Sequence, residues 1–129
     1  MLIRQSKNTF IRFIDESVHI MNQVTFQDRI YDEAGTDFLK EINRTPQKVD
    51  DIVDSLKKLY GDSVSHEELY NDFMEFVTDL AEHHFLVLGN TPEELDAHDI
   101  EFSYSMPNLK TQTNDYTQNT IQQVEENTR

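Results

Sequence analysis

Cysteine is absent from the 129-residue chain. Disulfide bonds, thiolate nucleophiles, cysteine-ligated zinc and iron–sulfur clusters held by this chain are therefore excluded. Only three glycines are present, and no GxGxxG, P-loop or GxSxG motif occurs. Such a chain has little backbone for cradling phosphate and no recognisable nucleophile. We expect a protein that is not an enzyme and that carries no cofactor or metal of its own.

Basic residues are also scarce, with 11 Lys and Arg against 25 Asp and Glu, which gives a formal net charge of −14. A chain of this charge repels polyanions such as DNA or an anionic membrane surface. No apolar run approaches the ~20 residues of a membrane-spanning helix, and Met1–Phe10 alternates apolar with polar or basic residues. The sequence predicts a cytoplasmic protein with no nucleic-acid or membrane partner.

Apolar residues are unevenly distributed, with 37 in residues 1–90 and 10 in residues 91–129. The core is therefore expected in residues 1–90, as one domain. Residues 91–129 are expected to form a polar tail or linker, and the stretch from Pro107 onward, rich in Thr, Gln and Asn, is expected to be disordered because it has too few apolar residues to offset the entropy of ordering.

Three strands are predicted in the N-terminal third. Thr9–Ile14 is β-branched and aromatic, Asp15-Glu16 interrupts it, and Ser17–Asn22 alternates, a pattern typical of a β-hairpin. Thr25–Tyr31 is expected to add a third strand, with Phe26 and Ile30 facing the core and Gln27 and Arg29 facing away.

Three helices are predicted next. Asp32 can cap a first helix over Glu33–Ile42, and Thr45-Pro46 can open a second helix that ends at Gly61. Ser65 and Glu68 have the spacing of a capping box for a third helix that runs to about His83. Phe85–Leu88 is a short apolar segment, either a strand or a core plug, and Thr91–Glu94 can open one more helical turn. This order predicts an α+β winged helix-turn-helix fold, with a three-stranded antiparallel sheet followed by three helices.

The helix in the position of a DNA-recognition helix has the wrong charge for that role. Between Ser65 and His84 it carries six acidic residues and no Lys or Arg, whereas binding to DNA phosphates needs positive charge. The five histidines lack the HExxH spacing of a zinc site, and His83-His84 is expected to lie at a helix C-terminus, where imidazolium meets the helix dipole favourably. Acidic pairs such as Asp50-Asp51 and Glu67-Glu68 are expected at helix starts for the same electrostatic reason.

A peptide-binding site is the remaining candidate. The free edge of a small sheet exposes N–H and C=O groups that can pair with an added strand, and the third helix would floor the adjoining groove. The candidate peptide-binding residues are Thr25, Phe26, Gln27, Asp28, Arg29, Ile30 and Tyr31 on the strand, and Leu69, Tyr70, Phe73, Met74 and Val77 on the helix. The alternative is that most apolar residues of this helix, Phe76 and Leu80 among them, belong to the core.

Three sequence blocks occur in a recognisable order between Arg12 and Leu88. They are YDEAG at Tyr31–Gly35, VDDIVDSLKKLYG at Val49–Gly61, and a helix with Asp72-Phe73, Phe76-Val77 and Leu80 that precedes FLVL. Their order and spacing resemble the PqqD family, small peptide chaperones of pyrroloquinoline quinone biosynthesis, and the wider class of RiPP recognition elements. The chain departs from the family pattern at Tyr31-Asp32, where Leu-Asn is usual, and at His83-His84, which replaces a glycine.

The resemblance implies that the leader segment of a ribosomally made precursor peptide adds as a strand beside Thr25–Tyr31. Tyr70, Phe73 and Met74 would then supply side-chain selectivity, and the module would present the core peptide to a modifying enzyme. In PqqD relatives that enzyme is often a radical-SAM protein, whose cluster and cofactor belong to the partner. Because this chain is acidic, the bound segment is expected to be apolar with some basic residues.

Two other functions stay open from the sequence. One is a structural winged-helix subunit whose groove holds a strand or helix of a partner protein. The other is a DNA-binding regulator, which the charge disfavours. The alternating segment Asp99–Met106 (DIEFSYSM) is also expected to be able to fold back onto the same edge and compete with a leader.

Overall fold

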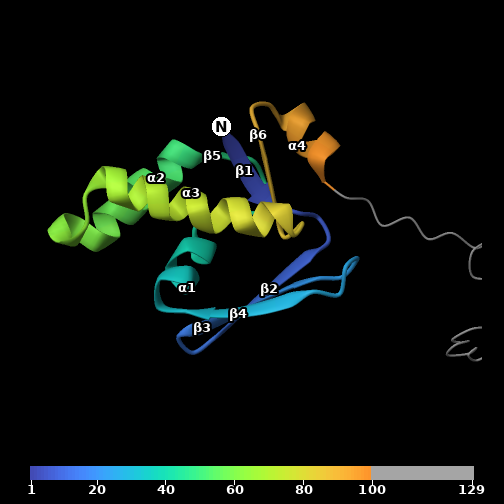
Figure 1. The fold of residues 1–129 in the computed structure, drawn as a ribbon, viewed down its shortest axis with the longest axis horizontal. Coiled ribbons are helices and arrows are strands. Elements are labelled where there is room, and N and C mark those ends of the chain that lie inside the picture. The colour runs from blue at the N-terminus through green and yellow to red at the C-terminus, as the bar shows by residue number, and fades with distance from the viewer. Residues whose placement is uncertain (100–129) are drawn as a thin grey trace, which may run out of the picture.

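A computed structural model describes residues 1–99 of the chain (Figure 1). Most of the predicted tail, and all of the alternating segment except Asp99, lie outside the described residues. The folded part extends beyond residue 90, because helix α4 (Pro92–His98) buries Leu95 completely. The boundary expected at residue 90 is therefore too early.

The first sheet has the strand order β2-β3-β4 and is antiparallel throughout. Strands β2 (Thr9–Ile14) and β3 (Ser17–Asn22) form the predicted hairpin. Asp15 in its two-residue turn has a φ of 55°. Val18 and Ile20 on β3 are fully buried, and they form the sheet's contribution to the core.

The third strand differs from the prediction in its start and in the face that each residue presents. Strand β4 covers Asp28–Asp32, because Asn22 holds the preceding residues in a turn: its side-chain oxygen accepts from the Val24 and Thr25 amides. Phe26 in this turn has a φ of 62°. After this turn, the side chains of β4 alternate in the opposite sense to the prediction. Phe26 and Ile30 are 81% and 72% exposed, and Arg29 faces inward.

A second sheet, with the order β5-β1-β6, was not predicted. Strand β1 (Leu2–Gln5) pairs antiparallel with β5 (Gln47–Lys48) and with β6 (Leu86–Gly89). The Phe85–Leu88 segment, for which a strand and a core plug were both open, thus supplies a strand. Because Gln47 and Lys48 are extended, the second helix begins at Val49 and not at Thr45-Pro46.

The helices follow the predicted order. They are α1 (Glu33–Lys40), α2 (Val49–Tyr60), the 3-10 turn η1 (Gly61–Ser63), α3 (His66–Glu82) and α4. The capping box of Ser65 and Glu68 is confirmed. Asp32 occupies the N-cap of α1, but its side chain makes no capping hydrogen bond. His84 has a φ of 68° and so takes the left-handed conformation that glycine usually supplies after a helix.

One hydrophobic core joins the two sheets to α1, α2 and α3. Figure 1 shows these helices on the upper side of the β2–β3–β4 sheet, with nothing on its lower side. The helix-turn-helix of α2 and α3, together with the hairpin, confirms the predicted α+β winged-helix class.

Helix α4 is tied to β1 by a buried ionic contact. Arg4 donates to the carboxylates of Asp99 at 2.8 Å and Asp96 at 2.9 Å, and the Ser6 hydroxyl donates to Asp99 at 2.5 Å. Burial opposes ionisation of Asp99, but the hydrogen bonds from Ser6, Arg4 and the Lys7 amide outweigh it and lower the pKa of Asp99. The last described residue is therefore fixed against the start of the chain.

Candidate peptide-binding site

The free edge of β4 is defined by the pairing of the sheet. Asn22 donates its backbone N–H to Gln27 on the β4 side, so alternate residues of β3, including Ile20 and Val18, also direct their backbone groups toward β4. Their partners on β4 are Arg29 and Tyr31. The N–H and C=O groups of Asp28 and Ile30, and the N–H of Asp32, therefore point to the free edge and can pair with an added strand. The C=O of Asp32 belongs to the N-cap of α1.

Helix α3 lies beside this strand. The ring of Tyr31 meets the ring of Phe76 edge-on, with centroids 5.0 Å apart, and Phe76 also contacts Phe38 on α1. Arg29 reaches from β4 to the carboxylate of Asp79 on α3. The guanidinium of Arg29 also lies 5.6 Å from the centre of the Phe85 ring. These contacts hold β4 and one flank of α3 next to each other.

The arginine at this site keeps its charge. A hydrogen bond that Arg29 donates to the Tyr31 hydroxyl raises the pKa of Arg29 most, burial lowers it, and the hydrogen bond to Asp79 raises it again. The net direction is upward. Arg29 is therefore a fixed cation between the strand and the helix.

A glycine sets the approach of α1 to the same strand. A Cβ on Gly35 would lie 2.6 Å from the Cβ of Tyr31, which no real pair of side chains tolerates. The glycine of the YDEAG block thus lets the first turn of α1 lie directly against the end of β4.

A pocket of about 160 Å³ lies where α1, η1 and α3 meet. Its apolar lining includes Phe38, Val64 and Leu69, and Tyr60 and Asp72 contribute polar groups. The Tyr60 hydroxyl donates to Asp37 at 2.7 Å. Burial and this hydrogen bond raise the pKa of Tyr60 to about 12. The pocket can accept one apolar side chain at the α1 end of the strand edge.

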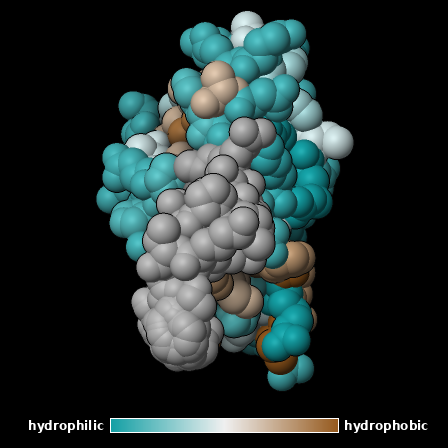
Figure 2. Space-filling view, turned by 90° about the vertical axis from the view of Figure 1, so that its right-hand side faces the viewer, coloured by the Kyte–Doolittle hydropathy of each residue, from teal (hydrophilic) through white to brown (hydrophobic). Residues whose placement is uncertain are grey.

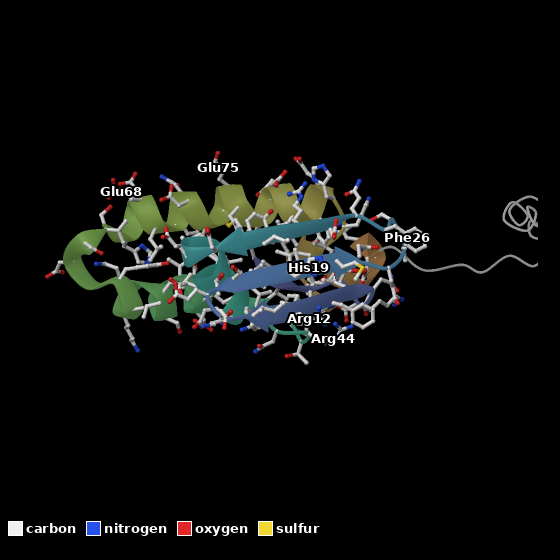
Figure 3. All side chains as sticks on the ribbon, turned by 90° about the horizontal axis from the view of Figure 1, so that it is seen from below. Arg12, His19, Phe26, Arg44, Glu68 and Glu75 are labelled. Carbon is white, nitrogen blue, oxygen red and sulfur yellow. The ribbon has the colours of Figure 1, made fainter. Side chains whose placement is uncertain are left out.

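Acidic residues line α3. Asp72 and Asp79 share the flank of Phe76, since they stand four and three residues from it. Figure 3 shows Glu68 and Glu75 on the side of α3 that faces away from the sheet. No Lys or Arg lies on this helix. A ligand between β4 and α3 therefore meets negative charge along its helix side.

The structure brings only part of the predicted residue set together. Of the strand residues, Asp28–Tyr31 lie on β4, whereas Thr25, Phe26 and Gln27 lie in the turn before it. Leu69, Phe73 and Val77 are at most 2% exposed, so Phe73 and Val77 belong to the core and Leu69 meets a ligand only as a wall of the pocket. Tyr70 and Met74 lie on the flank of α3 opposite to Asp79 and Phe76, because the helix turns about 100° per residue.

Phe76, Asp72 and Asp79 were missed as candidates. Asp72, Phe76 and Asp79 have the i, i+4 and i+7 spacing of residues on one flank of a helix, and this spacing can be read from the sequence. Nothing in the sequence shows which flank of the helix faces the strand. In the part of the chain that the structure describes, no three His, Asp or Glu side chains gather as metal ligands, and no helix is long and apolar enough to cross a membrane.

Comparisons with known proteins agree with this geometry. Residues 30–86 match the family model described as Coenzyme PQQ synthesis protein D (PqqD). The matched stretch starts within β4 and ends on β6, so it contains all of α3 and the last three residues of β4. No curated protein matches the chain.

Among solved structures, the fold is similar to that of "TbiB1 in Complex with the TbiA(beta) Leader Peptide". The TM-score is 0.60 at 20% sequence identity, and the match covers 68% of this chain and 99% of that chain. At this identity the likeness establishes the fold alone.

Proposed function

We propose, from the match of residues 30–86 to the PqqD family model, that this chain binds the leader segment of a ribosomally synthesised precursor peptide. The leader adds as a strand to the free edge of β4 and lies against the Phe76 flank of α3. The observation that carries the proposal is that the free backbone groups of Asp28 and Ile30 lie on the edge of β4 beside this flank. The leader peptide bound to the structurally similar TbiB1 supports the same class of ligand.

Backbone pairing supplies affinity that tolerates many sequences, and the pocket and the helix flank supply selectivity. The pocket lined by Phe38, Val64 and Leu69 takes an apolar side chain of the leader. Asp72 and Asp79 favour leader residues with positive charge. The side chain of Asp79 is 51% exposed although it also contacts Arg29. We therefore expect an apolar leader with basic residues, whose affinity falls as salt concentration rises.

The module binds and does not catalyse. It presents the core peptide to a separate or fused modifying enzyme, with a radical-SAM enzyme as one candidate partner, and any cluster or cofactor belongs to that enzyme. Ribosomes synthesise the precursor peptide in the cytoplasm, so a module that binds its leader would act there.

The direct test is affinity capture of the tagged full chain from an extract of its native host, followed by mass spectrometry of bound peptides and proteins. A short ribosomal peptide, recovered alone or with a maturation enzyme, supports the proposal. The N-terminal segment of that peptide is then labelled and titrated by fluorescence anisotropy, with its C-terminal segment as the matched control. Binding of the N-terminal segment alone is expected.

Two outcomes contradict the proposal. If only large folded proteins are recovered, the module is a structural winged-helix subunit. If a parallel assay of the captured material for nucleic acid recovers a specific sequence, the charge argument is wrong and the chain is a DNA-binding regulator.

A further inference from the structure

The side of the β2–β3–β4 sheet that faces away from the helices carries large apolar side chains. Directly opposite residues form three cross-strand rows on this side: Phe10–Met21–Asp28, Arg12–His19–Ile30 and Ile14–Ser17–Asp32. We call these nine residues the outer sheet face. Figure 3 looks onto it, with Arg12 and His19 labelled and no helix in front.

Four of these side chains are exposed hydrophobic residues. Phe10 is 56%, Ile14 50%, Met21 38% and Ile30 72% exposed. Antiparallel sheets with one solvated face normally place polar residues there. Figure 2 shows several hydrophobic side chains at the lower right of the molecule, with hydrophilic ones among them. Four exposed hydrophobic residues on one side of a three-stranded sheet point to an interaction surface.

The charges on the outer sheet face are divided between its two edge strands. Arg12 lies on β2, and Asp28 and Asp32 lie on β4. His19 in the centre contacts Asp28 at 3.0 Å. Among the described residues, no carboxylate lies within ion-pair distance of Arg12, so its charge is available to a partner. A surface with a cation on one edge and anions on the other is complementary to itself.

We propose that the outer sheet face binds the same face of a second copy of this chain, in a two-fold symmetric dimer. With the two-fold axis parallel to the strands, β2 of one copy lies over β4 of the other, and the sheets stack about 10 Å apart. Arg12 then lies opposite Ile30 of the partner copy, between Asp28 and Asp32 of the partner copy. The apolar side chains fill the space between the sheets.

Charge favours this face over the rest of the surface. Each copy carries −14, and two such surfaces repel wherever acidic side chains meet. On the outer sheet face, apolar side chains lie together with Arg12 and with the carboxylates of Asp28 and Asp32. A three-stranded face is smaller than the roughly 800 Å² per partner of a standard interface, so we expect a weak dimer with a dissociation constant on the order of tens of micromolar.

The dimer leaves the leader site open. Strand addition uses the free edge of β4 and the α3 flank, whereas the dimer uses the outward side chains of the sheet. Dimerisation is therefore independent of the proposed leader binding.

Sedimentation velocity of the full chain, measured across a wide range of protein concentrations near physiological salt, tests the proposal. We expect a monomer–dimer equilibrium that Phe10→Asp shifts toward monomer by at least tenfold in dissociation constant. Leu59→Asp is the matched control, because Leu59 is a 62% exposed hydrophobic residue on α2 and outside the face; it should leave the equilibrium unchanged. Circular dichroism checks that each variant is folded.

A charge exchange tests the arrangement of the two copies. Arg12→Glu should weaken the dimer, the pair Asp28→Arg and Asp32→Arg should weaken it as well, and the three substitutions together should restore it. A wild-type chain that sediments as a monomer at every concentration overturns the proposal. So does a dimer that Phe10→Asp leaves intact, or a charge exchange that fails to restore association.

Discussion

Strand addition at β4 makes a prediction about single backbone N–H groups. The Ile30 N–H points to the free edge of β4, whereas the Arg29 N–H pairs with β3. Ile30→Pro therefore removes a donor that only the leader uses. Proline is compatible with an edge strand when its missing N–H faces away from the neighbouring strand, so the fold should survive.

The expected magnitude follows from what the leader loses. One hydrogen bond disappears, and a carbonyl of the bound leader is left without a donor, which together cost about 2–3 kcal/mol. This corresponds to a roughly 30–150-fold weaker leader affinity. Ile30→Ala, which keeps the N–H, should change the affinity far less, because the Ile30 side chain points away from α3.

The chain offers a matched control on the opposite edge of the sheet. Phe13 on β2 has its N–H directed to the free edge of β2, since its neighbours Arg12 and Ile14 are the residues that hydrogen-bond to β3. Phe13→Pro should leave leader affinity nearly unchanged. Fluorescence anisotropy of the labelled leader with folded variants gives the comparison. Equal losses for both proline variants, or a loss only for Phe13→Pro, would refute strand addition at β4.

Three further outcomes are expected. Phe76→Ala should leave the protein folded and weaken leader binding about tenfold, as measured by anisotropy. Phe73→Asp should instead unfold the chain, because Phe73 is fully buried and packs against Phe38. A Phe73→Asp variant that stays folded but loses leader binding would contradict the assignment of Phe73 to the core. Asp99→Asn should lower the free energy of unfolding in urea by about 2–3 kcal/mol at pH 7, against less than about 1 kcal/mol for the exposed Asp96→Asn. Because the pKa of Asp99 is lowered in the folded state, the destabilisation caused by Asp99→Asn should be complete above the pKa of Asp in the unfolded chain, about 4. It should disappear as the pH falls through the lower pKa of the folded state. A destabilisation that persists in strong acid would contradict the role of the Asp99 carboxylate. The pKa of Tyr60 is raised to about 12. The stabilisation by the neutral Tyr60 hydroxyl is therefore present below the pKa of Tyr in the unfolded chain, about 10, and is lost between about pH 10 and pH 12. In a titration followed by tyrosine absorbance, Tyr60→Phe should remove a step at high pH, and removal of a step near pH 10 would contradict the raised pKa.

Most of the fold follows from local patterns in the sequence. The hairpin at Asp15-Glu16, the capping box at Ser65 and Glu68 and the helical spacing of α2 each concern residues that are neighbours along the chain. The second sheet does not, because β1 pairs with residues more than forty positions away. Two of its strands have four residues and one has two, too short for alternation to distinguish them from a loop.

The helix wall of the site could not be assigned from the sequence for a similar reason. Leu69, Phe73 and Val77 make an apolar stripe, but a stripe shows only that one side of the helix is buried. Which flank borders β4 depends on Arg29 and Tyr31, and their inward orientation depends on the turn held by Asn22. A turn ending one residue earlier or later would present the other set of side chains.

The same register decides what each surface of the sheet can bind. Because Arg29 and Tyr31 face α3, the side chains of Asp28, Ile30 and Asp32 must face outward. The backbone groups of Ile30 must then point to the free edge. The turn at Asn22 therefore fixes the exposed hydrophobic face together with the strand-binding edge. Asn22→Ala removes the side-chain oxygen that accepts from Val24 and Thr25, and it should weaken leader binding and dimerisation in parallel. An effect on one alone would show that the two surfaces do not share this origin.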